Sequence, residues 1–281
     1  MIAIPLSGTI GGPLGGWLLG LNGRFGLAGW QWLFVVEGVP SVLLGFVVLR
    51  YLTERPGEAH WLSNEQRALL VARLDRDVTP AHAAHGLSAL RGLAHPLIWL
   101  AALPELLVTT AGYAYLFWGP TLIRGALHTS NSTTGWITGG IAALCAIGML
   151  VVGASSDRTG ERALHAAACA TVAAISCAGA GLLGPPALRI ASLALAEVAV
   201  ISFLAPFWCL PTMLLSGSAA AVGIALVNAI GNVGGFVGPN VIGFLRTATG
   251  GDTGAFLCLA AMALVAAGIC VGMRGSLRAG S

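Results

Sequence analysis

The sequence predicts an all-α integral membrane protein, a bundle of about eight transmembrane helices. Three observations carry this prediction. Of the 281 residues, 56% are hydrophobic and 9% are charged, whereas a soluble domain needs about 25% charged residues to cover its surface. The apolar residues fall into stretches of about 20, the length that crosses the hydrocarbon core as a helix. The 40 glycines allow helix backbones to approach closely where no hydrophobic effect drives association.

The apolar stretches follow one another along the chain with short polar breaks. The first opens the chain directly, without the basic segment that precedes the apolar core of a cleavable signal peptide. The predicted spans are 1–21, 31–51, 97–120, 133–154, 163–183, 188–212, 219–245 and 254–273. The polar breaks are 22–24, 124–131, 155–162, 184–186, 216–218 and 246–252.

One longer polar segment, 52–95, separates the second span from the third and is rich in charged residues. Within it, 62–65 has the pattern of a capping box, so an amphipathic helix is expected to begin there. The chain therefore divides into two helices in 1–51, a central loop in 52–95, and a six-helix part in 96–281.

Arginine supplies every basic side chain, and its distribution predicts the orientation. If the 52–95 loop is cytoplasmic, ten arginines lie on that side and four on the other. Because cytoplasmic loops carry an excess of basic residues, we expect both termini and the 52–95 loop in the cytoplasm, with the chain crossing the membrane several times. The ten are Arg50, Arg55, Arg67, Arg73, Arg76, Arg91, Arg158, Arg162, Arg274 and Arg278, and the four are Arg24, Arg124, Arg189 and Arg246.

Several kinds of partner find no support in the composition. The net charge of +3 is too small and too scattered to predict nucleic-acid binding. The six cysteines lie in apolar stretches without metal-ligand spacing, so buried side chains are expected rather than disulfides or a metal site. No cofactor is predicted, and the expected surroundings are the lipid bilayer.

Two short segments repeat each other. Residues 8–12 read Gly-Thr-Ile-Gly-Gly and residues 231–235 read Gly-Asn-Val-Gly-Gly, and a proline follows each, Pro13 and Pro239. Repeated halves are typical of secondary transporters, which rock one bundle against the other. Helix kinks that such motions could use are expected at Pro206, Pro211, Gly234, Gly235, Gly238 and Pro239.

The loop after the fourth span carries a recognisable motif. Gly153, Asp157, Arg158, Gly160 and Arg162 follow the spacing of the cytoplasmic signature loop of the major facilitator superfamily, which they resemble. A glycine there allows two helices to approach, and Asp157 at a helix end can meet a basic group or a helix N-terminus, so the motif is predicted to gate the inner side. Glu161 departs from the usual basic residue of that motif.

A finer resemblance is to the anion:cation symporter branch of that family, of the tartrate and phthalate type. It rests on residues 29–38, 115–121, 206–211 and 219–239, in the right order along nearly the whole chain. The resemblance implies the fifth and sixth helices in 1–51, the complete C-terminal half in 96–281, and no counterpart of the first four helices. It also implies transport of a small organic anion, such as tartrate, a sugar acid or an aromatic acid, with protons, across the inner membrane of a bacterial cell.

The resemblance also assigns a substrate site. Asn228 matches the family's substrate-contacting asparagine, and Trp208 matches its tryptophan on the preceding helix. Asn232 lies four residues after Asn228 and therefore on the same helix face. Amide and indole N–H groups can donate hydrogen bonds to a carboxylate, although an asparagine can equally bond to a neighbouring helix. Tyr113 and Tyr115 are further candidates, with gating and interfacial anchoring both open.

Three carboxyl groups lie within the predicted spans. Hydrocarbon disfavours the charged form of a carboxyl, so Glu105 and Glu197, near the middle of their helices, are candidate proton carriers or else protonated packing residues. Glu37 lies near a helix end and is expected to be structural.

The resemblance also implies what these 281 residues lack. The first four helices normally supply the cationic residue that pairs with the substrate, so we expect no uptake in vesicles from these residues alone and a separate N-terminal half as a partner. A truncated product or a wrongly placed start would have the same consequence. The alternatives are a non-transporting fragment or subunit and, since the cluster at residues 157–161 has no histidine and no companion acidic pair elsewhere, less readily a membrane enzyme.

Overall fold

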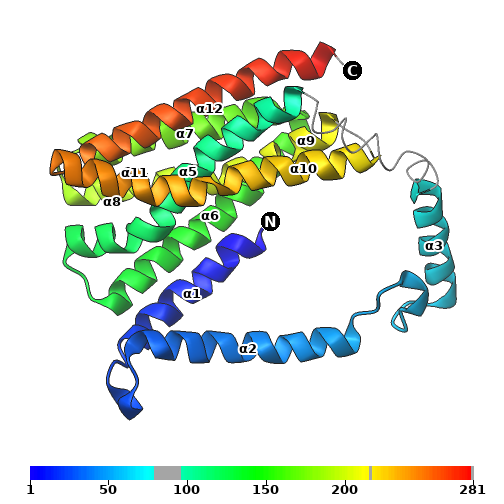
Figure 1. The fold of residues 1–281 in the computed structure, drawn as a ribbon, viewed down its shortest axis with the longest axis horizontal. Helices are drawn as coiled ribbons and strands as arrows, with labels where there is room; N and C mark the ends of the chain where they lie inside the picture. Colours follow the sequence, from blue (N-terminus) through cyan, green and yellow to red (C-terminus); the bar gives the residue numbers. More distant parts are fainter. Residues whose placement is uncertain (79–95, 215–216, 280–281) are drawn as a thin grey trace.

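The computed structural model describes residues 1–78, 96–214 and 217–279, and every regular element in these ranges is a helix. The end of the predicted central loop, including Arg91, and Ser216 lie outside the described residues. Figure 1 shows the helices running nearly parallel to one another, with a separate short helix at one end. The helices are α1 (Ala3–Leu19), α2 (Gly29–Tyr51), α3 (Asn64–Val78), α5 (Pro96–Leu127), α6 (Asn131–Thr159), α7 (Arg162–Leu182), α8 (Pro186–Phe207), α9 (Cys209–Leu214), α10 (Gly217–Asn232), α11 (Gly234–Thr249) and α12 (Thr253–Ala279).

Seven spans among the described residues are long and apolar enough to cross a membrane. They are α2, α5, α6, α7, α8 continued by α9, α10 continued by α11, and α12. The first predicted span forms α1, which has 17 residues and so lies at the short limit for a spanning helix. The all-α membrane fold is therefore confirmed, with α1 shorter than the stretch 1–21 that was predicted.

Two of the spans are interrupted where proline and glycine were expected to soften them. α8 ends at Phe207, directly after Pro206, and α9 begins at Cys209. α10 ends at Asn232 and α11 begins at Gly234. Proline removes a backbone donor and its ring clashes with the carbonyl group four residues earlier, so Pro211 of α9 explains the interruption after Phe207.

Glycine faces bring two pairs of helices into backbone contact. A Cβ atom added at Gly12 of α1 would lie 2.7 Å from the carbonyl oxygen of Gly135 in α6, and one added at Gly16 would lie 2.6 Å from that of Asn131. On the other side, a Cβ at Gly234 of α11 would lie 2.9 Å from the backbone nitrogen of Thr110 in α5. Both copies of the repeated glycine segment thus serve close helix packing.

The core lies in the six-helix part. Alanine and cysteine side chains of α7 and α12 are buried together with Phe203 and Phe207 of α8. The rings of these two phenylalanines are stacked with centroids 4.8 Å apart. Small side chains allow these helices to pack closely without a large apolar core.

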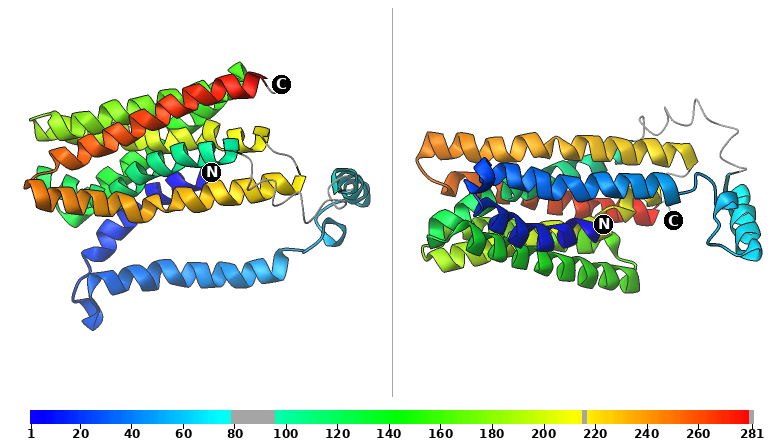
Figure 2. Two further views of the ribbon diagram at one scale, coloured as in Figure 1. Left: turned by 45° about the horizontal axis from the view of Figure 1, so that its top comes forward. Right: turned by 90° about the horizontal axis from the view of Figure 1, so that it is seen from below.

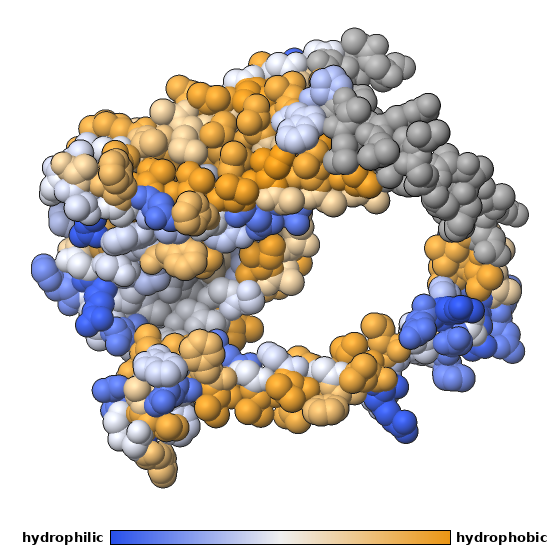
Figure 3. All heavy atoms as spheres, viewed as in Figure 1, coloured by the Kyte–Doolittle hydropathy of each residue, from blue (hydrophilic) through white to orange (hydrophobic). Residues whose placement is uncertain are grey.

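α2 and α3 lie away from this core. Within α2, only Gly29 is buried, and Figures 1 and 2 show α2 connected to the bundle through α1 at one end. Apolar residues cover α2 and the outside of the bundle, whereas hydrophilic residues gather around α3 (Figure 3). α3 begins with the expected capping box, in which the Ser63 hydroxyl accepts from the Gln66 nitrogen and Gln66 Oε1 accepts from the Ser63 nitrogen.

Candidate functional site

A central cavity of about 390 Å³ lies between α1, α5, α8 and α10. On each long helix its lining residues recur every three or four positions, so a single face of the helix lines it. Of the residues that the sequence analysis selected, Glu105, Tyr113, Glu197, Trp208, Asn228 and Asn232 all line this cavity.

The two asparagines and one tyrosine form a chain of hydrogen bonds on the cavity wall. The Tyr113 hydroxyl donates to Asn232 Oδ1 at 2.7 Å. Asn232 Nδ2 in turn donates to Asn228 Oδ1 at 3.1 Å and to the Asn228 carbonyl oxygen at 2.8 Å. Within the described part of the chain, Asn228 Nδ2 has no hydrogen-bond partner, so its two N–H groups remain available to a ligand.

Trp208 supplies a second donor. It follows the last residue of α8 at the interruption before α9, and its ring meets Phe207 edge-on with centroids 5.7 Å apart. The indole ring lines the cavity, which combines an apolar face with one N–H donor.

Glu105 approaches the cavity from α5 and is 4% exposed. Its Cγ atom lies where a side chain at Gly231 would begin, so the glycine of α10 makes room for the glutamate. Thr109, one turn further on, donates to the Gly231 carbonyl oxygen at 2.8 Å. Glu105 Oε2 is buried without a hydrogen-bond partner among the described residues.

Glu197 and Tyr115 lie deeper. Glu197 lines the central cavity and also a second cavity of about 10 Å³, which Tyr115 lines as well. Both Glu197 Oε2 and the Tyr115 hydroxyl are buried without a hydrogen-bond partner in the described residues. Tyr115 is therefore separated from the central cavity, unlike the other candidate residues.

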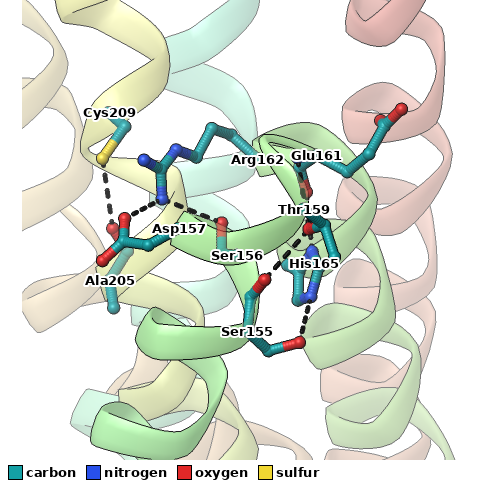
Figure 4. A network of polar contacts seen from close by, with 9 residues as sticks. All are labelled: Ser155, Ser156, Asp157, Thr159, Glu161, Arg162, His165, Ala205 and Cys209. Atoms are coloured by element: carbon teal, nitrogen blue, oxygen red, sulfur yellow. Dashed lines mark hydrogen bonds and ion pairs between the residues drawn. The ribbon is translucent and has the colours of Figure 1, made fainter.

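The signature motif lies at the end of the bundle where α6 turns into α7 (Figure 4). Gly160 ends α6 with a φ of +70°, a conformation that glycine adopts without strain. Arg162 forms an ion pair with Asp157 and donates to the Ser156 hydroxyl at 3.2 Å. Arg158 is exposed and has no partner in the part of the chain that the structure describes.

The neighbours of two motif residues can be described further. A Cβ added at Gly153 would lie 3.6 Å from the Ala205 side chain, which is an ordinary contact, whereas one added at Gly148 of the same helix would lie only 2.6 Å from the Ser202 hydroxyl of α8. Asp157 pairs with a basic group, Arg162, which is the first residue of the neighbouring helix α7.

Glu161, which departs from the family motif, has an ion pair of its own. Arg274 of α12 donates to both of its carboxylate oxygens, at 2.9 and 3.0 Å. The departure therefore ties the α6–α7 loop to the last helix of the chain.

The opposite end of the bundle carries charged residues that the sequence analysis did not select. Asp252 forms ion pairs with Arg246 at 3.1 Å and with Arg189 at 3.7 Å. These three residues line a polar cavity of about 280 Å³. Arg246 and Asp252 lie in the predicted polar break 246–252 and Arg189 lies three residues after the break 184–186. This was a usable signal, since every second break lies at the same end of a helical bundle.

Comparison with known proteins gives one matching family and several relatives. The Major Facilitator Superfamily matches residues 1–239. The relatives include two proteins of Agrobacterium vitis named as candidate tartrate transporters, 37% and 38% identical over 95% of the chain, and the inner membrane transport protein RhmT of Escherichia coli, 34% identical over 93% of it. The chain spans 59%, 61% and 60% of the lengths of these relatives.

A solved structure has a similar fold. It is a bacterial homologue of the human lysosomal transporter Spinster, in an inward-facing and unoccupied conformation. It aligns with 98% of the chain at a TM-score of 0.64 and 17% identity, and the chain covers 67% of it.

Proposed function

Since the chain belongs to the major facilitator superfamily, we propose that it takes part in the transmembrane transport of a small organic anion, coupled to protons by alternating access. The observation that carries this proposal is the convergence of Asn228, Asn232, Tyr113 and Trp208 on one cavity together with Glu105 and Glu197. The relatives named above are transporters rather than enzymes.

The anion would be bound by neutral donors. The hydrogen-bond chain from Tyr113 through Asn232 uses the oxygen atoms of Asn228 and leaves its N–H groups toward the cavity. A carboxylate can accept from these groups and from the Trp208 indole, whose ring packs against the ligand's carbon atoms. The relatives named for tartrate favour a dicarboxylate as substrate.

Proton binding would be coupled to anion binding through the charge of two glutamates. Glu105 and Glu197 line the cavity that would hold the anion, so an ionised carboxylate there would repel it. At a separation of ~8 Å and an effective dielectric constant of ~20, two like charges repel by ~2 kcal/mol, a factor of about 30 in affinity. The anion therefore binds best when both carboxyl groups carry their protons, and the two cargoes move together.

A binding measurement tests this proposal. Titration of the chain in nanodiscs with tartrate or phthalate, in lightly buffered solution, should show binding that weakens as the pH rises and that takes up protons. Replacing both acids (Glu105→Gln with Glu197→Gln) should remove the proton uptake and flatten the pH dependence while binding remains. Binding without proton uptake in the unmodified chain would contradict the coupling.

The same proposal includes a partner, namely a separate N-terminal half of the transporter. α2 buries only Gly29, and the α1 side of the central cavity is lined by Met1 and Ile4, so a complementary helical half would cover apolar surface on both. We expect proteoliposomes that contain the chain and a separately expressed N-terminal half of a tartrate-type relative to take up the anion, whereas the chain alone does not. Uptake by the chain alone would contradict the need for this partner.

A further inference from the structure

Two buried oxygen atoms meet at the small cavity between α5 and α8. The Tyr115 hydroxyl and Glu197 Oε2 have no hydrogen-bond partner in the described residues, and both side chains line the same cavity of about 10 Å³. A buried polar atom left without a partner destabilises a fold by ~1–3 kcal/mol. Two of them at one cavity indicate that a small polar ligand joins them.

The cavity has the size of one water molecule, for which ~10–15 Å³ suffices. A water there can accept from the Tyr115 hydroxyl and donate to Glu197 Oε2, so both atoms gain a partner. The Cys177 thiol of α7 lines the same cavity and adds a weak third contact.

The small cavity lies between two larger ones. Leu122, Leu193 and Phe256 line both it and the polar cavity at the Arg246 end of the bundle. Glu197 and Val200 line both it and the central cavity. Glu197 is thus reached from the polar cavity past three apolar side chains, and it faces the central cavity on its other side.

We propose that Tyr115 and Glu197 hold a water molecule, and that this water is the proton entrance to the central cavity from the Arg246 end. The entrance is separate from the Asn228–Trp208 side of the central cavity, where the anion would bind. Its role in coupling rests on the proposed function, but the path itself needs no substrate.

The proton transfer balances without another reactant. A proton from the polar cavity reaches the bound water when the three apolar side chains move apart, and the water passes one of its protons to the Glu197 carboxylate. The products are a neutral carboxylic acid and a neutral water. Tyr115 keeps its own proton and acts as a positioning residue for the water.

The groups that face Glu197 favour this neutral form. Tyr115 of α5 and Cys177 of α7 line the small cavity together with it, and Glu105 lines the central cavity together with it. None of these groups is a cation, and a carboxylate in hydrocarbon without a cationic partner is costly.

Infrared spectroscopy of the chain in nanodiscs tests the entrance. The carbonyl band of protonated Glu197 is assigned as the band that Glu197→Gln removes, and its exchange is followed after transfer to heavy water. We expect Tyr115→Phe, which removes only the hydroxyl, to shift this band. Leu193→Phe, which narrows the path, should slow its exchange by about tenfold, the effect of ~1.4 kcal/mol on a barrier.

Leu195→Phe is the matched control. Leu195 lies on the same helix and is exposed, so the same added volume should leave the exchange unchanged. Absence of a Glu197-dependent band, no band shift in Tyr115→Phe, or equal exchange in the Leu193 and Leu195 variants would overturn the entrance.

The same variants separate the two proposals. Tartrate binding in Leu193→Phe should match the unmodified chain, because Leu193 lies outside the central cavity. If tartrate binds but Leu193→Phe leaves the hydrogen exchange of Glu197 unchanged, only the proposed proton entrance is contradicted, and the proposed function stands. If exchange slows but no anion binds, the proposed function fails and the path stands.

Discussion

At the scale of single residues, Asn228 is the donor that distinguishes this cavity from an ordinary helix contact. An asparagine that only joined helices would use its amide nitrogen for a neighbouring chain segment. Here the nitrogen of Asn232 donates to both oxygen atoms of Asn228, one turn earlier on the same helix, and the Asn228 side-chain nitrogen has no partner among the described residues. Asn232 therefore orients the Asn228 side chain, and Asn228 can bind a ligand with its free N–H groups.

This division predicts unequal effects. Asn228→Ala removes a hydrogen bond to a charged ligand, worth ~1.5–3 kcal/mol, so tartrate affinity should fall about tenfold or more in a nanodisc titration. Asn240→Ala is the matched control, because its amide binds the Phe236 carbonyl oxygen and lies outside the cavity. Equal tartrate affinities in the two variants would show that Asn228 does not contact the ligand.

The Glu161–Arg274 pair gives a second prediction at this scale. Restoring the family's basic residue with Glu161→Arg places two cations together, and exchanging both (Glu161→Arg with Arg274→Glu) restores an ion pair. Both side chains are partly exposed and therefore screened by solvent, so the single variant should lower the unfolding midpoint only slightly. Thermal unfolding should show recovery in the double variant, and no recovery would mean that the pair does not hold the loop.

Sequence spacing predicted the shared face of Asn228 and Asn232, since helical neighbours four apart are fixed by local geometry. It could not separate Tyr113 from Tyr115. Two positions rotate a side chain by about 200° around a helix, so one tyrosine faces the central cavity and the other the small one. Which of them does so depends on how α5 packs against α8 and α10, and that packing is not encoded locally.

At the scale of elements, glycine faces hold α1 against α6. Gly12 and Gly16 of α1 lie against backbone atoms around Gly135, and Pro13 lies against Gly139. The repeated segment in the sequence was read as a sign of two related halves. Its copies in α1 and in α10–α11 both lie in close helix contacts, but at different glycines: Gly12 in the first copy and Gly234, which corresponds to Gly11, in the second.

A paired substitution tests the α1–α6 contact. Gly12→Ala would place a methyl group against the Gly135 backbone and should lower stability by ~1–3 kcal/mol. Gly11→Ala is the control, because a Cβ there meets nothing within 4 Å, and it should be neutral or gain up to ~1 kcal/mol. Thermal unfolding in detergent compares the two, and equal midpoints would count against a backbone contact.

The interruptions in the long spans were predictable in part. Pro211 identified the first, since a proline cannot donate to the carbonyl group four residues earlier, here that of Phe207. Pro239 was expected to act in the same way but lies inside α11 without interrupting it, and the second interruption falls at Val233. Neighbouring helices decide whether a proline's freed backbone groups need a break, so sequence alone does not give the position.

At the scale of the whole molecule, the distribution of arginines predicts which end faces the cytoplasm. Gly57 and Gly184 lie at exposed positions where an added side chain meets nothing within 4 Å, so cysteine can replace either without strain. In intact cells, a membrane-impermeant maleimide should label Gly184→Cys and spare Gly57→Cys. Inverted vesicles should give the opposite result, and the same labelling in both would contradict the orientation.

The α1–α6 contact also determines where the chain can bend. Where large side chains interdigitate, they must change rotamer before two helices can tilt against each other. A contact between the backbones of two glycines contains no such side chains, so tilting there requires no rotamer change. We therefore expect α1 and α2 to tilt about the contact between Gly12 and Gly135, while the other six spans keep their packing. A bulky residue at this contact would restrict the tilting of α1 against α6 as well as push the two helices apart.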